Sequence, residues 1–351
     1  MKLLDDSAST LGRPLARVSA LLAAIGALAL VASLVLRSGP AAIAALAASW
    51  LFLVGLGAGG LALSAAARVA QGRFLDPVLP RVEALSGFLP AALGILAVLV
   101  AAAPAWVPGS RGGAWATLAV RDLLGGAVLF ALGSAFLRRS RRDRWARTTA
   151  RAAIAYLAAY AVVLSLWTVD LIVGLSPGEP SAIVPPQAFM AALLSAIAWA
   201  ALWGSPSEKL RHDLGRLLFG FCAFWAYLVW CSVLPVWYAN IPAETAEVLA
   251  RWSGGWRALS IGILCSTFVV PFTLLLPERT KRSRAWLGGC ATSVLAGLAA
   301  ERFLLVVPPL HLGSSAIRIV LGALVALGMA GCFAVLYGAA LAANRSHADH
   351  G

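Results

Sequence analysis

The sequence predicts an all-α fold, a polytopic transmembrane bundle of about ten helices. Hydrophobic residues make up 61% of the 351 residues, and charged residues make up only 12%. The mean hydropathy is +0.86, and long apolar runs recur from one end of the chain to the other. Soluble globular domains carry about 25% charged residues. Lipid, rather than water, must therefore surround most of this chain.

Ten apolar runs are long enough to cross a bilayer core, which takes about 20 residues per helix. They are 17–36, 41–67, 84–106, 115–137, 151–175, 186–204, 215–238, 256–277, 285–308 and 316–343. Short segments rich in Pro, Gly and charge separate them, so neighbouring helices should pack antiparallel. We expect a segment at 1–16, a transmembrane helical domain at 17–343 and a tail at 344–351.

The distribution of Lys and Arg predicts the orientation. The N-terminal segment, the even-numbered loops and the tail hold 21 of the 28 Lys and Arg residues, and the loop 138–151 alone holds seven. Loops that carry excess positive charge stay on the cytoplasmic side. Both termini are therefore predicted to be cytoplasmic, and the net charge of +13 is assigned to a membrane surface rather than to nucleic acid.

The Cys and His residues do not form a pattern typical of a bound redox centre. The five cysteines all lie in apolar runs without a CxxC or CxxCH spacing, and no span carries a His pair at haem spacing. We expect this chain to bind no haem, iron–sulfur cluster or metal by itself. The run GLGAGG at 55–60 lies inside a span, so its GxxxG pair predicts close helix packing rather than dinucleotide binding.

Ionisable residues inside the spans are the clearest signals of function, because a charge in lipid is costly and is expected to face the bundle interior. The fourth span holds Arg121 and Asp122, the fifth holds Asp170, and the ninth holds Glu301 and Arg302. Structural ion pairing is the alternative. The two interpretations are balanced for Asp170, and pairing is favoured for Arg121 and Asp122.

Two further charged groups lie where spans begin. Asp213 and Arg216 open the seventh span three residues apart, hence on one helix face, and structural pairing is favoured for them. Glu83 opens the third span near Arg81.

The segment WYANIPAE at 237–244 ends the seventh span. Pro242 can begin a short helix, Glu244 suits its first turn, and Asn240 is a good cap residue. A capped chain reversal and a surface for docking a partner are both consistent with this segment.

The stretch 212–256 reads HDLGRLLFGFCAFWAYLVWCSVLPVWYANIPAETAEVLARWSGGW. It resembles the ActF-type membrane subunit of bacterial alternative complex III, a relative of the NrfD and polysulfide-reductase membrane subunits. The matches are a DLGKLL-like start, an FWAY-like middle and a WYxNIPEE-like end. Weaker similarity extends to Arg81–Glu83, to Asp170 with 175–177, to Lys281–Arg282 and to 301–308. Arg216 replaces the family's Lys, Ala243 replaces an acid and Leu171 replaces a Trp.

The resemblance implies a cofactor-free subunit of a quinol:electron-acceptor oxidoreductase in the bacterial inner membrane. It implies menaquinone or ubiquinone at or near this chain, with haem c and iron–sulfur clusters in partner subunits. The partners implied are an NrfD-like sister subunit, an iron–sulfur subunit and a multihaem cytochrome c. Its role in quinol-linked electron transport would be to support electron transfer, assembly and proton translocation.

A proton path would use titratable side chains spaced through the bundle. The candidates are Glu83, Asp122, Tyr160, Asp170, Asp213, Tyr227 and Glu301. The candidates for motif contacts and partner docking are Arg216, Trp237, Tyr238, Asn240, Pro242 and Glu244. One alternative is a quinol-binding anchor of an NrfD or polysulfide-reductase type of complex that does not pump protons. A secondary transporter, expected to show inverted repeats and broken helices, is the other.

Overall fold

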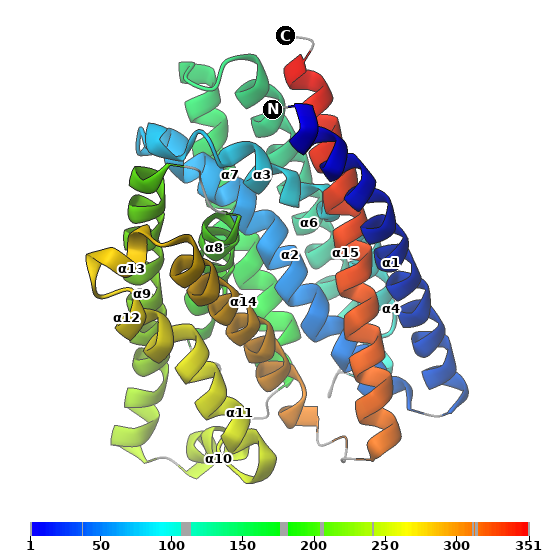
Figure 1. Cartoon of the computed structure of the whole chain (residues 1–351). Coiled ribbons are helices and arrows are strands. Elements are labelled where there is room, and N and C mark those ends of the chain that lie inside the picture. Colours follow the sequence, from blue (N-terminus) through cyan, green and yellow to red (C-terminus); the bar gives the residue numbers. More distant parts are fainter. Residues whose placement is uncertain are drawn as a thin grey trace.

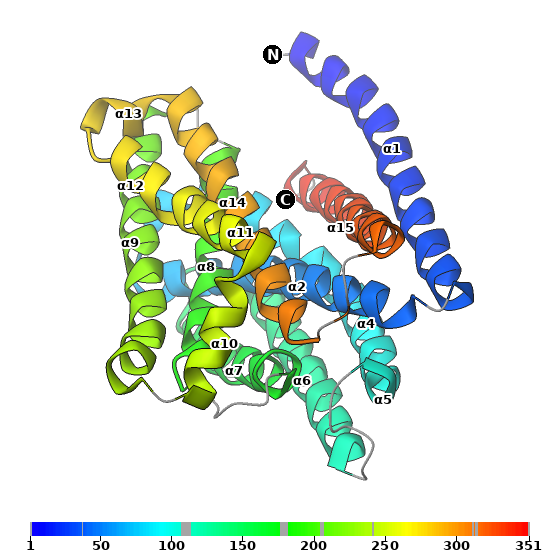
Figure 2. The same cartoon turned by 90° about the horizontal axis from the view of Figure 1, so that it is seen from below.

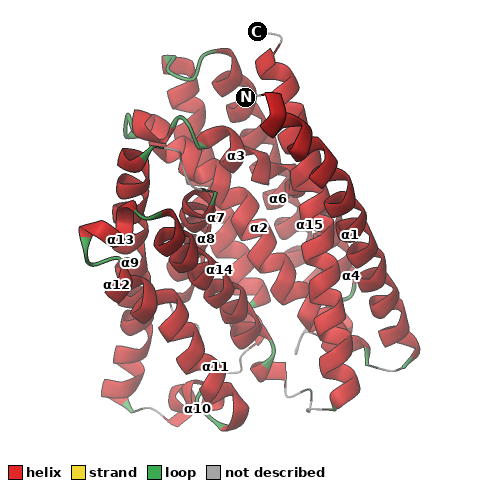
Figure 3. Cartoon of the chain, viewed as in Figure 1, coloured by secondary structure: helices red, strands yellow, loops and turns green. Residues whose placement is uncertain are grey.

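A computed structural model describes residues 2–36, 38–106, 114–175, 182–203, 207–240, 242–310, 312 and 315–349. These residues form helices and connecting loops, with no strand among them (Figure 3). Ten of the helical segments are long and apolar enough to cross a membrane, and each overlaps one of the ten predicted runs. The predicted all-α polytopic bundle is therefore confirmed, and the chain is a multi-pass membrane protein.

The helices follow one another along the chain with short connections. They are α1 (Lys2–Val35), α2 (Gly39–Val69), α3 (Leu79–Glu83), α4 (Leu89–Ala101), α5 (Ala103–Trp106), α6 (Ala114–Arg142), α7 (Arg147–Leu171), α8 (Val184–Leu202), α9 (Glu208–Ala239), α10 (Pro242–Arg251), α11 (Gly254–Leu264), α12 (Val270–Leu274), α13 (Glu278–Arg282), α14 (Arg284–Val306) and α15 (Ala316–Asp349). Single 3-10 turns lie at Arg73–Leu75, Ala84–Phe88, Val173–Leu175 and Pro308–Leu310.

The helix α1 begins, and α15 ends, on the same side of the bundle (Figure 1). We call this side proximal and the opposite side, where α10 lies, distal. Figure 2 shows α1 at the edge of the bundle beside α15. The two helices meet where the backbones of Gly26 and Gly328 touch, because neither residue has a side chain to hold them apart.

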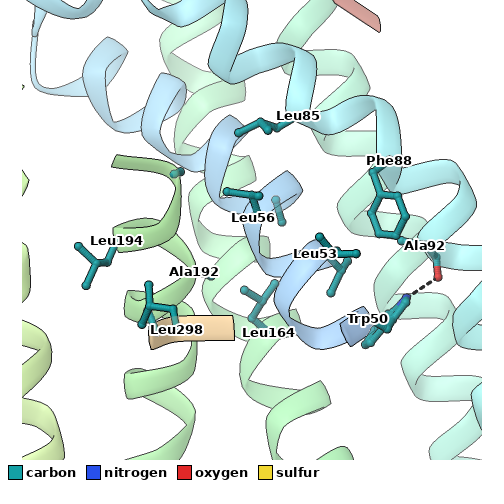
Figure 4. Close-up of a cluster of buried hydrophobic side chains, with 14 of the residues drawn as sticks. Trp50, Leu53, Leu56, Leu85, Phe88, Ala92, Leu164, Ala192, Leu194 and Leu298 are labelled. Carbon is teal, nitrogen blue, oxygen red and sulfur yellow. Dashed lines mark hydrogen bonds between the residues drawn. The ribbon is translucent and has the colours of Figure 1, made fainter. Parts of the chain in front are cut away.

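The helix α2 is the buried centre of the bundle, and α7, α8, α14 and α15 pack around it. Leu53 and Leu56 of α2 face Leu164 of α7 and Leu298 of α14 across the apolar core (Figure 4). The indole N–H of Trp50 donates a 2.8 Å hydrogen bond to the backbone oxygen of Ala92 on α4. Buried Trp residues need such a partner for the ring nitrogen.

The glycines of the GLGAGG run confirm the packing prediction. A Cβ at Gly55 would lie 3.2 Å from the Ala192 Cβ, and one at Gly59 would lie 2.8 Å from the Ala192 carbonyl carbon. On the other side of α2, a Cβ at Gly60 would lie 2.6 Å from the Val82 oxygen. The absence of side chains therefore lets α8 and the α3 region approach the α2 backbone.

Two of the spans change helix type within their length rather than at an end. The third consists of α3, the 3-10 turn at Ala84–Phe88 and α4, and it has prolines in the first turn of each α-helical part. This span also begins earlier than predicted, at Leu79. The eighth contains a π-helical turn, Cys265–Val269, between α11 and α12, and Pro271 follows it. Such turns shift the side-chain register of a helix.

Candidate functional site

Four acidic side chains of the spans are enclosed by neighbouring helices. The side chain of Asp170 is 10% exposed, and that of Glu301 is 5% exposed. Asp122 and Glu83 are buried as well. This agrees with the expectation that charges in lipid must face the protein interior. The enclosed groups form three clusters, two distal and one proximal.

The first distal cluster surrounds Glu301, which lies near the distal end of α14. The amide of Gln187 on α8 and the indole N–H of Trp225 on α9 both donate to its Oε1 atom, at 2.9 and 3.1 Å. The guanidinium of Arg302 donates to Oε2 at 3.1 Å. Three donors, one of them the positively charged Arg302, therefore satisfy a carboxylate that is almost completely removed from solvent.

A cavity of about 460 Å³ lies beside this carboxylate, between α8, α9, α11 and α14, with α10 at its distal edge. Most of its lining is aliphatic, and the Trp225 ring forms part of one wall. Polar groups are few: besides Glu301 and Gln187 they include Ser232, Ser260 and Arg251. A mainly apolar cavity with a few convergent polar groups is the usual form of a small-molecule site, for which volumes of about 300–1,000 Å³ are typical.

Two irregular features of the helices lie at this cavity. Pro235 lies inside α9, where it cannot donate a backbone hydrogen bond, and the π-helical turn lies one residue after Leu264 of the lining. Both features disturb helix packing beside the cavity. At its distal edge, the Ser260 hydroxyl donates to the Arg251 backbone oxygen at 2.8 Å and ties α11 to α10.

The second distal cluster joins α6 to α7. Arg121 forms an ion pair with Asp170, and the carboxyl group of the buried Asp122 interacts with that of Asp170. The Trp167 indole N–H donates to the backbone oxygen of Asp122 at 3.2 Å. Two predicted site residues from different helices, Asp122 and Asp170, are thus brought together. The sequence favours an ion pair between Arg121 and its neighbour Asp122. In the structure, Arg121 pairs with Asp170 instead.

The proximal cluster surrounds Glu83. Its carboxylate accepts hydrogen bonds from the Ser64 hydroxyl and from Arg144, both at 2.6 Å. Arg68 donates to the backbone oxygens of Trp145 and Ala146 at 2.7 and 2.8 Å, and stacks on the Trp145 ring. These contacts fasten the turn between α6 and α7 to α2 and α3.

The remaining path candidates lie in different surroundings. Tyr160 is buried at the middle of α7, where its hydroxyl donates to the Phe189 backbone oxygen. Tyr227 is 59% exposed on α9 and lies outside the three enclosed clusters. Asp213 is partly exposed at the proximal end of α9 beside His212, and Arg216 is exposed. The expected pairing of Asp213 with Arg216 is not among the ion pairs of the described residues.

The motif at 237–244 forms the distal end of α9 and the start of α10. Trp237 and Tyr238 are 71% and 86% exposed. Asn240 ends α9 in the left-handed conformation, with φ of 50°, and Pro242 begins α10. Asn tolerates this conformation better than most residues, so it acts as a C-cap. Ile241, 176–177 and the side chains of Pro242 and Glu244 lie outside the described residues.

Sequence reasoning missed Gln187 as a site residue and did not assign a role to Trp225 beyond the motif. A signal for Gln187 was present, since it is an uncharged polar residue at the start of an otherwise apolar run. Trp225 could be assigned to the site only by knowing which face of α9 packs against α14.

A scan against known protein families and a search of curated proteins found no match to this chain.

Proposed function

We propose that this chain is a cofactor-free integral membrane subunit of a quinol:electron-acceptor oxidoreductase, resembling the ActF-type subunit of alternative complex III. The observation that carries this proposal is the cavity beside Glu301. The site offers a quinol headgroup an apolar enclosure, an aromatic wall at Trp225 and a carboxylate that accepts hydrogen bonds.

Quinol chemistry fits the donors and acceptors of the cavity. A quinol that gives up its electrons must also release its hydroxyl protons, and a carboxylate within hydrogen-bonding reach is a suitable proton acceptor. Arg302 donates to the Oε2 atom of Glu301, while Gln187 and Trp225 donate to its Oε1 atom and fix the carboxyl group at the cavity wall. The electrons would pass to a haem or iron–sulfur centre in a partner subunit.

The location of the cavity favours proton release on one side. It lies at the distal end of the bundle, and the seven arginines of 138–151 lie at the proximal end. If the basic end is cytoplasmic, as the positive-inside rule requires, quinol protons would leave on the outer side of the bacterial inner membrane. Electron transfer at this site would then contribute to a proton gradient.

Proton translocation through the chain is a second activity that the enclosed carboxyls favour. Glu83 lies near the proximal end, Tyr160 lies at mid-span, and Asp122 and Asp170 lie near the distal end. A quinol-binding anchor that does not pump protons would need only the cavity. Whether these interior carboxyl and hydroxyl groups carry protons therefore separates a proton-translocating subunit from such an anchor.

Gentle detergent purification of the native protein tests the proposed assembly. We expect an iron–sulfur subunit, a multihaem cytochrome c and an NrfD-like sister subunit to co-purify, with a haem spectrum that quinol reduces. A chain that purifies alone and transports a solute across vesicles would refute the proposal. Co-purification with a molybdenum or iron–sulfur reductase would favour the anchor instead.

A further inference from the structure

The cavity beside Glu301 is closed on most sides by helices that pack on one another. At the carboxylate itself α8, α9 and α14 converge, because Gln187 and Trp225 both donate to Glu301. The helix α14 also packs along α11, and the Ser293 hydroxyl donates at 2.9 Å to the Ser266 backbone oxygen in the π-helical turn that follows α11. The side between α9 and α11 remains to be considered.

The helices α9 and α11 face each other across the cavity instead of packing together. The helix α9 packs on α12 and on the π-helical turn, and on the distal side of these contacts α9 and α11 separate (Figures 1 and 2). Val233 and Val236 of α9 line the cavity, and Leu228 is the last buried residue of this helix among those described. Ser260 and Ile263 of α11 line it as well. The cavity therefore opens sideways between α9 and α11.

The helix α10 covers the distal end of the cavity. Its residues Val248 and Arg251 belong to the lining, and α10 packs on both α9 and α11. The hydrogen bond from the Ser260 hydroxyl to the Arg251 backbone oxygen fastens α10 to α11. A ligand that arrived from distal water would have to displace this helix, whereas a ligand that arrived between α9 and α11 would not.

The sideways opening lies at the depth of lipid chains. Glu301 is five residues from the distal end of α14 at Val306, and Val233 is six residues from the distal end of α9 at Ala239. At 1.5 Å per residue, these separations are roughly 8 and 9 Å. Each leaflet contributes about 15 Å of hydrocarbon to a bilayer core. An opening at this level therefore faces acyl chains rather than water.

We propose that the cavity receives its ligand sideways from the distal leaflet, between α9 and α11, and that this ligand carries a long hydrocarbon tail. The headgroup lies against Glu301, Gln187 and Trp225, and the tail passes Val233 into the bilayer. A ligand bound in this way leaves its tail among acyl chains, so the tail is never transferred through water. The identity of the headgroup as a quinol rests on the proposed function, whereas the sideways opening does not.

Photolabelling of the wild-type complex in vesicles tests the opening. The probe is a phosphatidylcholine with a light-activated diazirine on its acyl chain. We expect labels at Val233 and Ile263 in the cavity, besides those at Trp230 and Leu234, which are 56% and 37% exposed and do not line it. An excess of long-tailed quinone should suppress the labels in the cavity only.

The two possible failures of this labelling are distinguishable. Cavity residues that stay unlabelled while Leu234 is labelled would overturn the sideways opening. Labels in the cavity that long-tailed quinone does not suppress would support the opening and contradict the proposed quinol function.

A matched pair of variants tests where the tail lies. In Val233→Trp the added ring should crowd a bound tail, so affinity for a long-tailed quinone should fall about tenfold or more, and affinity for the tail-free headgroup no more than about twofold. Leu234→Trp, at the neighbouring residue outside the lining, should change neither affinity. Equal effects on the two quinones in folded Val233→Trp, or equal effects of the two variants, would overturn the assigned tail position.

Discussion

The side-chain amide of Gln187 on α8 lies 2.9 Å from the Oε1 atom of Glu301 on α14. The Trp225 indole nitrogen on α9 approaches the same oxygen to 3.1 Å. One buried carboxylate therefore joins three helices at the wall of the cavity. Loss of the Glu301 carboxylate should therefore disturb contacts of all three helices at the cavity.

Replacing Glu301 by Gln removes the proton acceptor while keeping the size of the side chain. The new amide group also leaves Arg302 without its counter-charge. Charge-assisted hydrogen bonds are worth roughly 1.5–3 kcal/mol, so quinol-dependent electron transfer should fall at least about tenfold. Glu278→Gln is the control, since Glu278 is exposed in α13 far from the cavity. Equal rates in the two variants would remove Glu301 from the mechanism.

Trp225→Phe keeps an aromatic ring in the cavity wall and deletes the N–H donor to Glu301. The loss of one hydrogen bond of about 1 kcal/mol should weaken binding of a quinol analogue several-fold. Trp230→Phe changes the same residue type on the exposed face of α9, where the side chain is 56% exposed, and should have no effect. Equilibrium titration of the purified complexes with the analogue compares the two. The account of Trp225 fails if both variants bind like the wild type.

Gly59→Ala should destabilise the bundle because a Cβ at this position meets the Ala192 backbone. Overpacking of this kind costs roughly 1–3 kcal/mol, which should lower the thermal unfolding midpoint in detergent. The control is Gly94→Ala, where no heavy atom lies within 4 Å of the added Cβ. That variant should be unchanged or up to about 1 kcal/mol more stable. A lower midpoint for the control than for Gly59→Ala would contradict the packing of α2 on α8.

Glu83→Gln should loosen the turn between α6 and α7, because Arg144 loses its charged partner. The expected cost is about 1–3 kcal/mol, limited by the water contact that Arg144 retains. Hydrogen exchange at 143–147 should accelerate. Glu208→Gln breaks an exposed pair with Arg282 and should change stability by no more than about 1 kcal/mol. Unchanged exchange at 143–147 in Glu83→Gln would show that this ion pair does not hold the turn.

The sequence was sufficient to predict the ten spans, because the length and hydropathy of each run are properties of single segments. The close packing at Gly55 and Gly59 and the short helix that begins at Pro242 also follow from local patterns. The enclosure of Asp170 and Glu301 followed from the cost of charge in lipid.

The parts that were not predicted depend on which helix faces meet. Trp225 and Tyr227 lie two residues apart in a helix that is apolar nearly all round, so their sequence does not show that one is buried and the other exposed. The meeting of Asp122 with Asp170, and of Gln187 with Glu301, requires contacts between helices that are distant in sequence. The cavity likewise lies between helices that are distant in sequence, so no hydropathy pattern reveals it.

Photolabelling with a light-activated quinone analogue tests the central claim most directly. In the native complex, we expect the labelled peptides of this chain to come from the cavity lining on α8, α9, α11 and α14, and excess unlabelled quinol to suppress the labelling. The labelling should decrease in Glu301→Gln and remain in Glu278→Gln. Labelling of this chain only outside the cavity, or equal labelling in both variants, would contradict the assignment of a quinol site beside Glu301.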